Sequence, residues 1–261
     1  MSGALIHFIM PDFRSYYSPT KSDTTTLILN AEESHHLVVV NRAEAGDPVI
    51  AFNGKGTEWI CTLIKSDKKA AHLNVISVTT ASALPFSITL AQALPKGTHM
   101  DDIVRKATEL GVTCIIPINT ERTQVKLESD RSERKIEKWQ NASLEAAKQC
   151  GNPWLPEITG LQEIKSVVES AQKYDLCLIA SLEKSSVSLK LVLSLFEKKS
   201  GRSPKTVLWL IGPEGDFTPE ELAYAKQHGF ESVTLGPLVL RCETAAISAI
   251  SILGYELQNR S

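Results

Sequence analysis

Two glycine turns near the C-terminus give the clearest chemical signal in this chain. Gly212-Pro213-Glu214-Gly215 comes directly after the apolar run Val207–Ile211, and Gly236-Pro237 follows a second short run, Ser232–Leu235. Glycine lets the backbone approach a ligand closely, and α/β proteins bind ligands beyond the carboxyl ends of their strands. Each glycine alone is typical of an ordinary turn, but such turns at two successive strand ends favour a ligand pocket.

Arg241 and Glu243 follow the second turn, at the start of a helix rich in small and apolar residues. An arginine at a helix N-terminus opposes the helix dipole, so a carboxylate must compensate, and Glu243 is the nearest candidate. One interpretation is structural, with Arg241 paired to Glu243 or to Glu214. The other is catalytic, because a guanidinium can donate hydrogen bonds to an oxygen on which negative charge develops.

Several other kinds of chemistry are not indicated. The chain has neither a G-x-G-x-x-G fingerprint nor a P-loop, so no dinucleotide site or phosphate cradle is expected. Its five cysteines are odd in number and scattered, without a C-x-x-C pair. This pattern predicts free thiols in a reducing compartment and argues against a disulfide framework or a zinc site. We expect no metal.

Charge and hydropathy set limits on location and partners. The first ten residues lack the basic segment of a signal peptide, and no apolar run approaches the length of a membrane span, so we expect a cytoplasmic protein. The formal net charge of −2 gives no overall attraction to nucleic acid, so RNA contacts would need local patches. Residues 122–138 interleave basic with acidic side chains, which fits a solvated helix at least as well as a phosphate patch.

Residues 1–82 are predicted to form a small β-rich domain. One helix is expected from Ala31 to Arg42, and the motif Asn53-Gly54-Lys55-Gly56 is typical of a turn between strands. Five short strands around one helix predict a compact barrel, of PUA-like or OB-like type. The expected strands lie at 6–9, 25–29, 49–52, 58–64 and 72–78.

Residues 83–261 alternate strands with helices, which predicts an α/β domain with a mostly parallel sheet and helices on both faces. Thr218, Pro219 and Glu221 have the spacing of a capping box at the start of a helix that ends at Gly229. Trp139 is expected in the core. Strands are expected at 88–94, 114–118, 174–180 and 207–211. Helices are expected from an N-cap at Thr98 to Gly111, at 129–150 and between the last two strands.

Five blocks in sequence order resemble one known family. They are an HHL block with Arg42 and Gly46-Asp47, the KATELGV block of Lys106–Val112, PINTER at Pro117–Arg122, the helix Trp139–Gly151, and GPEG with the later LRCETA. Together they cover nearly the whole chain. On these blocks the chain is identified as a member of the 16S ribosomal RNA uridine-N3-methyltransferase family, small-subunit methyltransferase E, of the SPOUT class.

The resemblance implies a knotted (trefoil) SPOUT methyltransferase domain at 83–261, preceded by a PUA-like RNA-binding β-barrel at 1–82. It implies S-adenosylmethionine as cofactor, 16S ribosomal RNA within the small subunit as partner, and Arg241 with Glu243 as catalytic residues at uridine N3. RNA-binding residues would be His36, Arg42, Lys106 and Arg122. Cofactor-binding residues would be Ala180, Ile211, Gly212, Pro213, Gly215, Leu235, Gly236, Leu240 and Thr244.

A homodimer is also implied, and the C-terminal helix supports it. Residues 245–257 carry more apolar side chains than one face of a surface helix needs, among them Ile247, Ile250, Ile252, Leu253 and Leu257. We therefore expect a two-fold dimer that buries part of this surface.

The chain departs from the family pattern beside the expected cofactor. Asp216 stands where the family usually has a second glycine, and Leu238 where arginine is common. A carboxylate at 216 would either discourage RNA phosphates or face solvent. Further departures are Asn41, Lys148 and Asn152, the second replacing a usual glutamate. Two other hypotheses are kept: a non-catalytic RNA-binding or ribosome-assembly factor on the same fold, and an unrelated α/β enzyme with a nucleotide cofactor, such as an oxidoreductase.

Overall fold

The computed structural model describes residues 13–19, 25–124 and 129–259 of the chain. The chain divides into two compact units. The first unit comprises residues up to Ala83 together with Ala147–Leu155, and the second comprises Leu84–Ala146 and Pro156–Ser261. Among the described residues no helix is both long and apolar enough to cross a membrane.

The first unit is built on a mixed sheet of five described strands. β1 (Phe13–Tyr16) pairs in parallel with β3 (Pro48–Phe52), and all the other pairs are antiparallel. The order across the sheet is β1-β3-β4-β5-β2, with β4 at Thr57–Lys65, β5 at His72–Thr80 and β2 at Thr26–Ile28. Four of the expected strands are thereby confirmed. The fifth, at 6–9, lies outside the described residues, and β1 was not predicted.

One helical segment packs on this sheet, as expected between Ala31 and Arg42. It has an α-helical part, α1 (Ala31–His35), and a π-helical part, η1 (His36–Val40). Asn30 begins it as N-cap, because its side-chain oxygen accepts a 2.8 Å hydrogen bond from the backbone N–H of Glu33. The core between helix and sheet is apolar and buried, including Leu27, Leu37, Leu63 and Leu73.

Residues 147–155 belong to the first unit although they lie within the range expected for the second domain. The backbone N–H of Gly56 donates to the carbonyl of Pro153 at 3.0 Å. Gly56 has φ +86°, and a Cβ there would lie 2.3 Å from the Trp154 ring, so only glycine fits. The predicted turn at 53–56 therefore has a second role, because the segment 147–155 packs against it.

The second unit is an α/β fold whose described strands all pair in parallel. The order is β12-β10-β11-β6-β7-β8, with β9 also on β7. The strands are β6 (Ser87–Ala93), β7 (Cys114–Asn119), β8 (Glu157–Ile158), β9 (Gln162–Glu163), β10 (Leu176–Ala180), β11 (Thr206–Ile211) and β12 (Phe230–Val233). The helices are α2 (His99–Glu109), α3 (Ser129–Cys150), α4 (Ile164–Glu169), η2 (Ala171–Lys173), α5 (Leu189–Ser200), α6 (Pro219–Gln227) and α7 (Cys242–Gln258).

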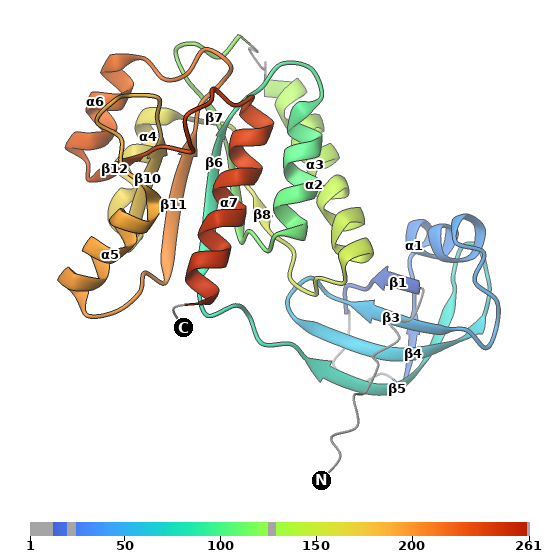
Figure 1. The fold of residues 1–261 in the computed structure, drawn as a ribbon. Coiled ribbons are helices and arrows are strands. Elements are labelled where there is room, and N and C mark those ends of the chain that lie inside the picture. Colours follow the sequence, from blue (N-terminus) through green and yellow to red (C-terminus); the bar gives the residue numbers. More distant parts are fainter. Residues whose placement is uncertain (1–12, 20–24, 125–128, 260–261) are drawn as a thin grey trace. The chain divides into compact units, whose positions relative to one another are not determined.

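Helices cover both faces of this sheet, as predicted (Figure 1). Alternate residues of β11 point to opposite sides: Trp209 packs with α2, α3, α5 and α7, whereas Leu208 and Leu210 pack with α4 and α6. Trp139 is buried in the first of these cores, as expected, and its indole N–H donates to Asp101 Oδ1 at 3.0 Å. The helix and strand types of this domain are therefore confirmed.

Two predicted details of this unit need correction. The last strand runs from Phe230 to Val233 rather than 232–235, because Phe230 is buried and pairs with Cys177 of β10. Thr98 precedes α2 but its side chain makes no capping hydrogen bond. The short elements β8, β9 and α4 were not predicted.

Candidate functional site

The carboxyl ends of β10, β11 and β12 meet at one edge of the parallel sheet, because β10 lies between the other two. β11 ends at Ile211 and continues into the turn Gly212–Gly215. Helix α6 then starts with the predicted capping box: Thr218 Oγ1 accepts from the Glu221 N–H at 3.2 Å, and Glu221 Oε2 accepts from the Thr218 N–H at 2.9 Å. The turn is thus held between a buried strand and a firmly capped helix.

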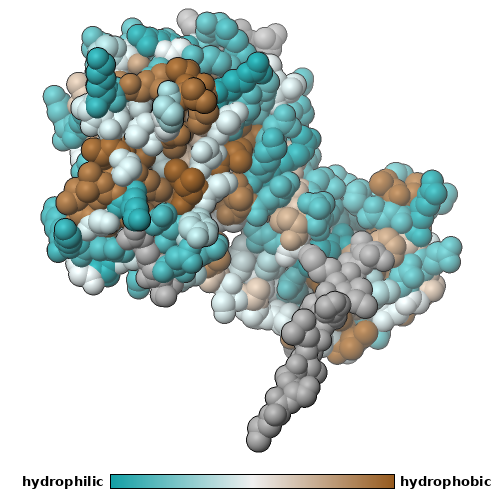
Figure 2. All heavy atoms as spheres, viewed as in Figure 1, coloured by the Kyte–Doolittle hydropathy of each residue, from teal (hydrophilic) through white to brown (hydrophobic). Residues whose placement is uncertain are grey.

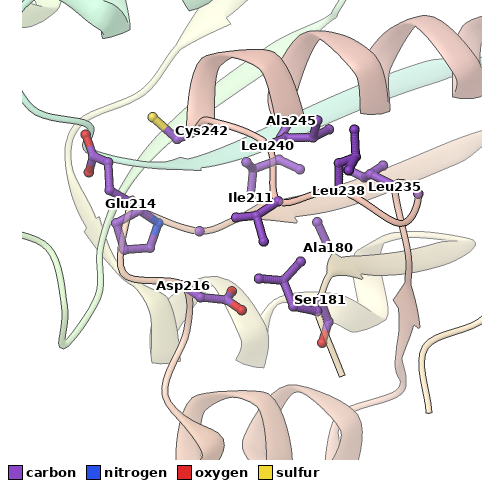
Figure 3. A pocket seen from close by; sticks show the side chains of 15 residues that line it. Ala180, Ser181, Ile211, Glu214, Asp216, Leu235, Leu238, Leu240, Cys242 and Ala245 are labelled. Atoms are coloured by element: carbon purple, nitrogen blue, oxygen red, sulfur yellow. The ribbon is translucent and has the colours of Figure 1, made fainter. Parts of the chain in front are cut away.

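A pocket lies at this edge of the sheet (Figure 3). Seven of the nine predicted cofactor residues line it: Ala180, Ile211, Gly212, Pro213, Leu235, Gly236 and Leu240. Gly215 and Thr244 lie outside the lining, and both are exposed. The other lining residues are Ser181, Leu182, Glu214, Asp216, Leu238, Val239, Cys242 and Ala245. Most of these residues are adjacent in sequence to predicted ones, so they could have been predicted by extending each predicted segment by one residue.

The two turns need glycine for different physical reasons. Gly236 has φ +122°, a conformation that L side chains rarely adopt, and its Cβ would meet open space. Gly212 has an ordinary φ, but a Cβ there would lie 3.3 Å from the Phe217 ring and 3.4 Å from Asp216 Oδ1. The first glycine is needed for its backbone angle and the second for close packing of the turn.

Arg122, predicted as an RNA contact, braces the first turn. Its Nη1 donates to the carbonyl oxygens of Gly215 at 2.7 Å and Phe217 at 3.2 Å. On the other side, the backbone N–H of Lys96 donates to Glu214 Oε1 at 3.0 Å. The turn that lines the pocket is therefore fixed by loops that follow β6 and β7.

Asp216 has an unusual backbone conformation and a half-buried side chain. Its φ of 60° lies in the left-handed region, which glycine, asparagine and aspartate tolerate best. Its Oδ1 accepts a 2.8 Å hydrogen bond from the backbone N–H of Phe217. Burial raises the pKa of this carboxyl, and nearby Glu183 and Glu221 add to that effect. The sequence offered two roles for Asp216, discouraging RNA phosphates or facing solvent, and the structure places its half-buried side chain in the pocket lining.

Arg241 and Glu243 lie at the start of α7. Arg241 is the N-cap residue, its side chain is exposed, and it forms no ion pair with any described residue, so neither structural pair considered for it is present. Glu243 instead has His99 Nδ1 at 4.0 Å and the Cys242 thiol at 3.3 Å. Its own backbone N–H, at the helix N-terminus, is the main cause that lowers the pKa of the Glu243 carboxyl.

The predicted RNA-binding residues are divided between the two units. His36 and Arg42 belong to the first unit, and Lys106 and Arg122 to the second. Arg42 is exposed, has φ 60°, and makes no hydrogen bond or ion pair with another described residue. His36 Nδ1 lies 3.4 Å from Asn41 Nδ2, and Lys106 is exposed on α2. The basic side chains at 126 and 131, noted in the sequence, lie outside the described side chains.

All five cysteines are free, and burial raises the pKa of Cys61, Cys114, Cys177 and Cys242 to about 12. Such thiols stay protonated and unreactive at neutral pH. In the part of the chain that the structure describes, no group of three or more His, Cys, Asp or Glu side chains is placed to hold a metal ion.

Comparison with known proteins places this site in context. Residues 82–254 match the RNA methyltransferase domain family, and residues 29–76 match the RNA methyltransferase PUA domain family. The chain is 31% identical to the ribosomal RNA small subunit methyltransferase E of Bacillus subtilis (strain 168) over 239 residues, which cover 90% of this chain and 92% of the relative.

Two solved structures are similar over almost their full length. A Legionella pneumophila protein solved with the bound cofactor SAM has a TM-score of 0.83 and 35% identity, and the match covers 94% of this chain and 97% of that one. A ribosomal RNA small subunit methyltransferase E from Neisseria gonorrhoeae, bound to S-adenosyl methionine, has a TM-score of 0.82 and 27% identity, with 95% and 98% covered.

Proposed function

This chain belongs to the ribosomal RNA small subunit methyltransferase E family, and on that basis we propose that it transfers a methyl group from S-adenosylmethionine to N3 of a uridine in 16S ribosomal RNA. The observation that carries the proposal is the pocket beyond β10, β11 and β12, lined by both glycine turns. Membership of a methyltransferase family argues against the other α/β hypothesis, a nucleotide-dependent oxidoreductase.

We place the cofactor in this pocket. The sulfonium supplies an already activated methyl group, so the protein needs to bind, orient and exclude water rather than to activate a nucleophile covalently. Apolar side chains such as Ile211, Leu235 and Leu240 would cover the adenosine, and backbone groups of the two turns would hydrogen-bond to it. Two solved relatives with bound S-adenosylmethionine support this assignment.

Arg241 is proposed to act on the base that is methylated. Loss of the N3 proton leaves negative charge on the two flanking carbonyl oxygens of uridine, and a guanidinium can stabilise that charge. Arg241 is exposed next to the pocket residue Leu240, and its guanidinium makes no hydrogen bond with another described residue. Glu243, whose carboxyl pKa is lowered, suits the role of a permanent anion beside the substrate better than the role of proton acceptor.

RNA would be held by both units. The PUA match at 29–76 contains His36 and the exposed Arg42, whereas Lys106 lies on α2 of the second unit. With a net charge of −2, affinity would come from such separate basic residues rather than from a general field. Arg122 would contribute through the cofactor turn that it braces.

We also propose the trefoil-knotted SPOUT arrangement, a cytoplasmic location and a homodimer. In Figure 2 several hydrophobic groups lie on the face of the second unit that bears α7. Exposed apolar side chains of this unit include Ile252 and Tyr255 on α7, Leu191 and Leu195 on α5, and Leu238 with Val239 beside the pocket. A surface of this kind fits a self-complementary two-fold contact.

The decisive experiment is methyl transfer to small ribosomal subunits from a strain that lacks the gene. Labelled S-adenosylmethionine is supplied, and the product is identified by nucleoside mass spectrometry, with Arg241→Ala as the matched control. We expect N3-methyluridine in the ribosomal RNA with the natural enzyme and a strong reduction with the variant. RNA binding without any turnover would instead favour the non-catalytic assembly factor, whose only support is the pair of departures at Asp216 and Leu238.

A further inference from the structure

The charged side chains that line the pocket are all acidic. They are Glu214 and Asp216, and no lysine, arginine or histidine is among the lining residues. The two carboxylates are in different situations. Glu214 is exposed at the edge, where it accepts the Lys96 N–H, whereas Asp216 is half-buried.

The Asp216 carboxylate points into the pocket. Figure 3 shows it directed toward the part of the pocket where Ala180 and Ser181 lie, while Glu214 lies at another edge near Cys242. One oxygen, Oδ1, accepts the Phe217 N–H, and no other hydrogen bond to this carboxyl is made by the described residues. The neighbouring cation, Arg122, is engaged by the carbonyls of Gly215 and Phe217 and forms no ion pair with Asp216.

A half-buried carboxylate that forms no ion pair with a described residue favours a ligand that brings a positive charge. The two ligands that a methyltransferase must distinguish differ in this respect. S-adenosylmethionine carries a sulfonium, an ammonium and a carboxylate, and so has one net positive charge. When the S–CH₃ bond breaks, sulfur keeps the electron pair, N3 of the uridine (its proton lost to solvent) supplies the pair for the new N–CH₃ bond, and S-adenosylhomocysteine is left with no net charge.

We propose that Asp216 is a specificity-determining residue that recognises the positive charge of the methyl donor, so that the pocket prefers S-adenosylmethionine over the demethylated product. This inference rests on the proposed function. The attraction of Asp216 to the sulfonium acts on the donor only, and it disappears when the methyl group leaves, whereas any attraction to the ammonium is common to donor and product. Asp216 therefore favours exchange of product for fresh donor after each turnover.

The backbone at this position allows a clean test. Asp216→Asn keeps the shape, the acceptor for the Phe217 N–H and the tolerance of φ 60°, and it removes only the charge. Asp216→Gly removes the side chain at an angle that glycine adopts freely. Glu214→Gln is the matched control, because it removes the other lining carboxylate but keeps an acceptor for the Lys96 N–H.

The affinities of S-adenosylmethionine and S-adenosylhomocysteine are measured by calorimetry for the natural enzyme and the three variants, with circular dichroism as the check of folding. We expect Asp216→Asn to lower the donor-to-product affinity ratio by about tenfold, the size of a Coulomb attraction between a carboxylate and the sulfonium near the protein surface, mainly by weakening the donor. Asp216→Gly should do the same, and Glu214→Gln should change the ratio less.

Three outcomes of these affinity measurements would overturn the role of Asp216. An unchanged ratio in folded Asp216→Asn or Asp216→Gly overturns the role of Asp216 while leaving the proposed function intact. Equal weakening of both ligands also overturns it, because it shows that Asp216 only shapes the turn. Binding of neither ligand to the natural enzyme refutes the proposed function itself, and this inference with it.

Discussion

The Arg122 guanidinium donates a 2.7 Å hydrogen bond to the carbonyl oxygen of Gly215, 93 residues further along the chain. A second bond, to the carbonyl of Phe217, makes this side chain a clamp on the turn that carries Asp216. The family resemblance suggested an RNA contact for Arg122, but its Nη1 already donates to the turn that lines the pocket. A residue on the loop after β7 thus controls the shape of the turn after β11.

Loss of this clamp should weaken cofactor binding. Arg122→Ala leaves two carbonyls without their donor, at a cost of about 1–2 kcal/mol, so we expect the Kd for S-adenosylmethionine to rise by about five- to thirtyfold. Calorimetry measures it. Lys106→Ala, which removes an exposed positive charge from α2, is the control and should leave cofactor binding unchanged. Unchanged cofactor affinity in Arg122→Ala, together with a smaller salt dependence of RNA binding, would return Arg122 to the role of a phosphate contact.

Removal of the Asp216 charge should stabilise the free protein in a pH-dependent way. Burial raises the pKa of this carboxyl above its unfolded value; Arg122 opposes the shift, and Glu183 and Glu221 add to it. A group with a raised folded pKa destabilises the folded state once it is ionised, so the penalty is absent below the unfolded pKa and complete above the folded one. Asp216→Asn should therefore raise the Tm at neutral pH.

The same Tm difference should shrink as the pH falls through the raised pKa of Asp216. Differential scanning fluorimetry without ligand, between neutral and acidic pH, measures it. Glu220→Gln, which removes an exposed carboxylate from the first turn of α6, serves as control and should not raise the Tm. A variant less stable than the natural protein at neutral pH would show that the Asp216 charge is compensated in the free pocket.

Sequence reasoning succeeded where the signal was local. Thr218, Pro219 and Glu221 specify the start of α6 by themselves, because a capping box depends only on residues three apart. It failed for the bounds of β12, which was expected at 232–235 but starts at the buried Phe230 and ends at Val233. Short edge elements such as β8 and β9 have too few residues to show a period.

The site was predictable in outline only. Glycine turns at strand ends located the pocket, since parallel strands bring their carboxyl ends to one edge. The direction of the Asp216 side chain was not predictable, because it depends on a left-handed backbone angle fixed by tertiary packing. The clamp by Arg122 joins residues that only the folded sheet brings together.

A buried ion pair in the first unit could not be predicted from the sequence pattern either. Lys148 replaces the glutamate usual in the family, and its Nζ lies 2.6 Å from Glu33 Oε1, with both side chains at most 7% exposed. Glu33 also accepts the backbone N–H of Tyr16 at 2.9 Å. The lysine at 148 is therefore matched by a carboxylate from the start of α1.

Breaking this pair should strongly destabilise the first unit. Lys148→Met leaves Glu33 buried and charged, which costs about 3–5 kcal/mol, and adding Glu33→Gln should recover much of the loss. Chemical denaturation measures both. The control is Lys138→Met on the same helix, whose partner is Asp101 but whose side chain is 60% exposed, and which should cost about 1 kcal/mol or less. Equal small losses for the two lysine variants would contradict the importance of burial.

Arg241 and Arg42 are both exposed, and neither forms an ion pair with a described residue. We expect substitution of Arg241 to affect methyl transfer and substitution of Arg42 to affect RNA binding. If Arg241 stabilises the charge that develops on the uridine oxygens, Arg241→Ala should lower kcat by about 100-fold or more, with little change in KM for the ribosomal subunit. Arg42→Ala is the matched control in the first unit. It should weaken RNA binding and reduce the slope of log affinity against log salt by about one counterion, while kcat at saturating substrate stays the same.

Steady-state kinetics and salt titrations of both variants measure these profiles. Modest and equal losses of affinity with kcat intact in both would remove Arg241 from the chemistry and leave methyl transfer to depend on the alignment of donor and base.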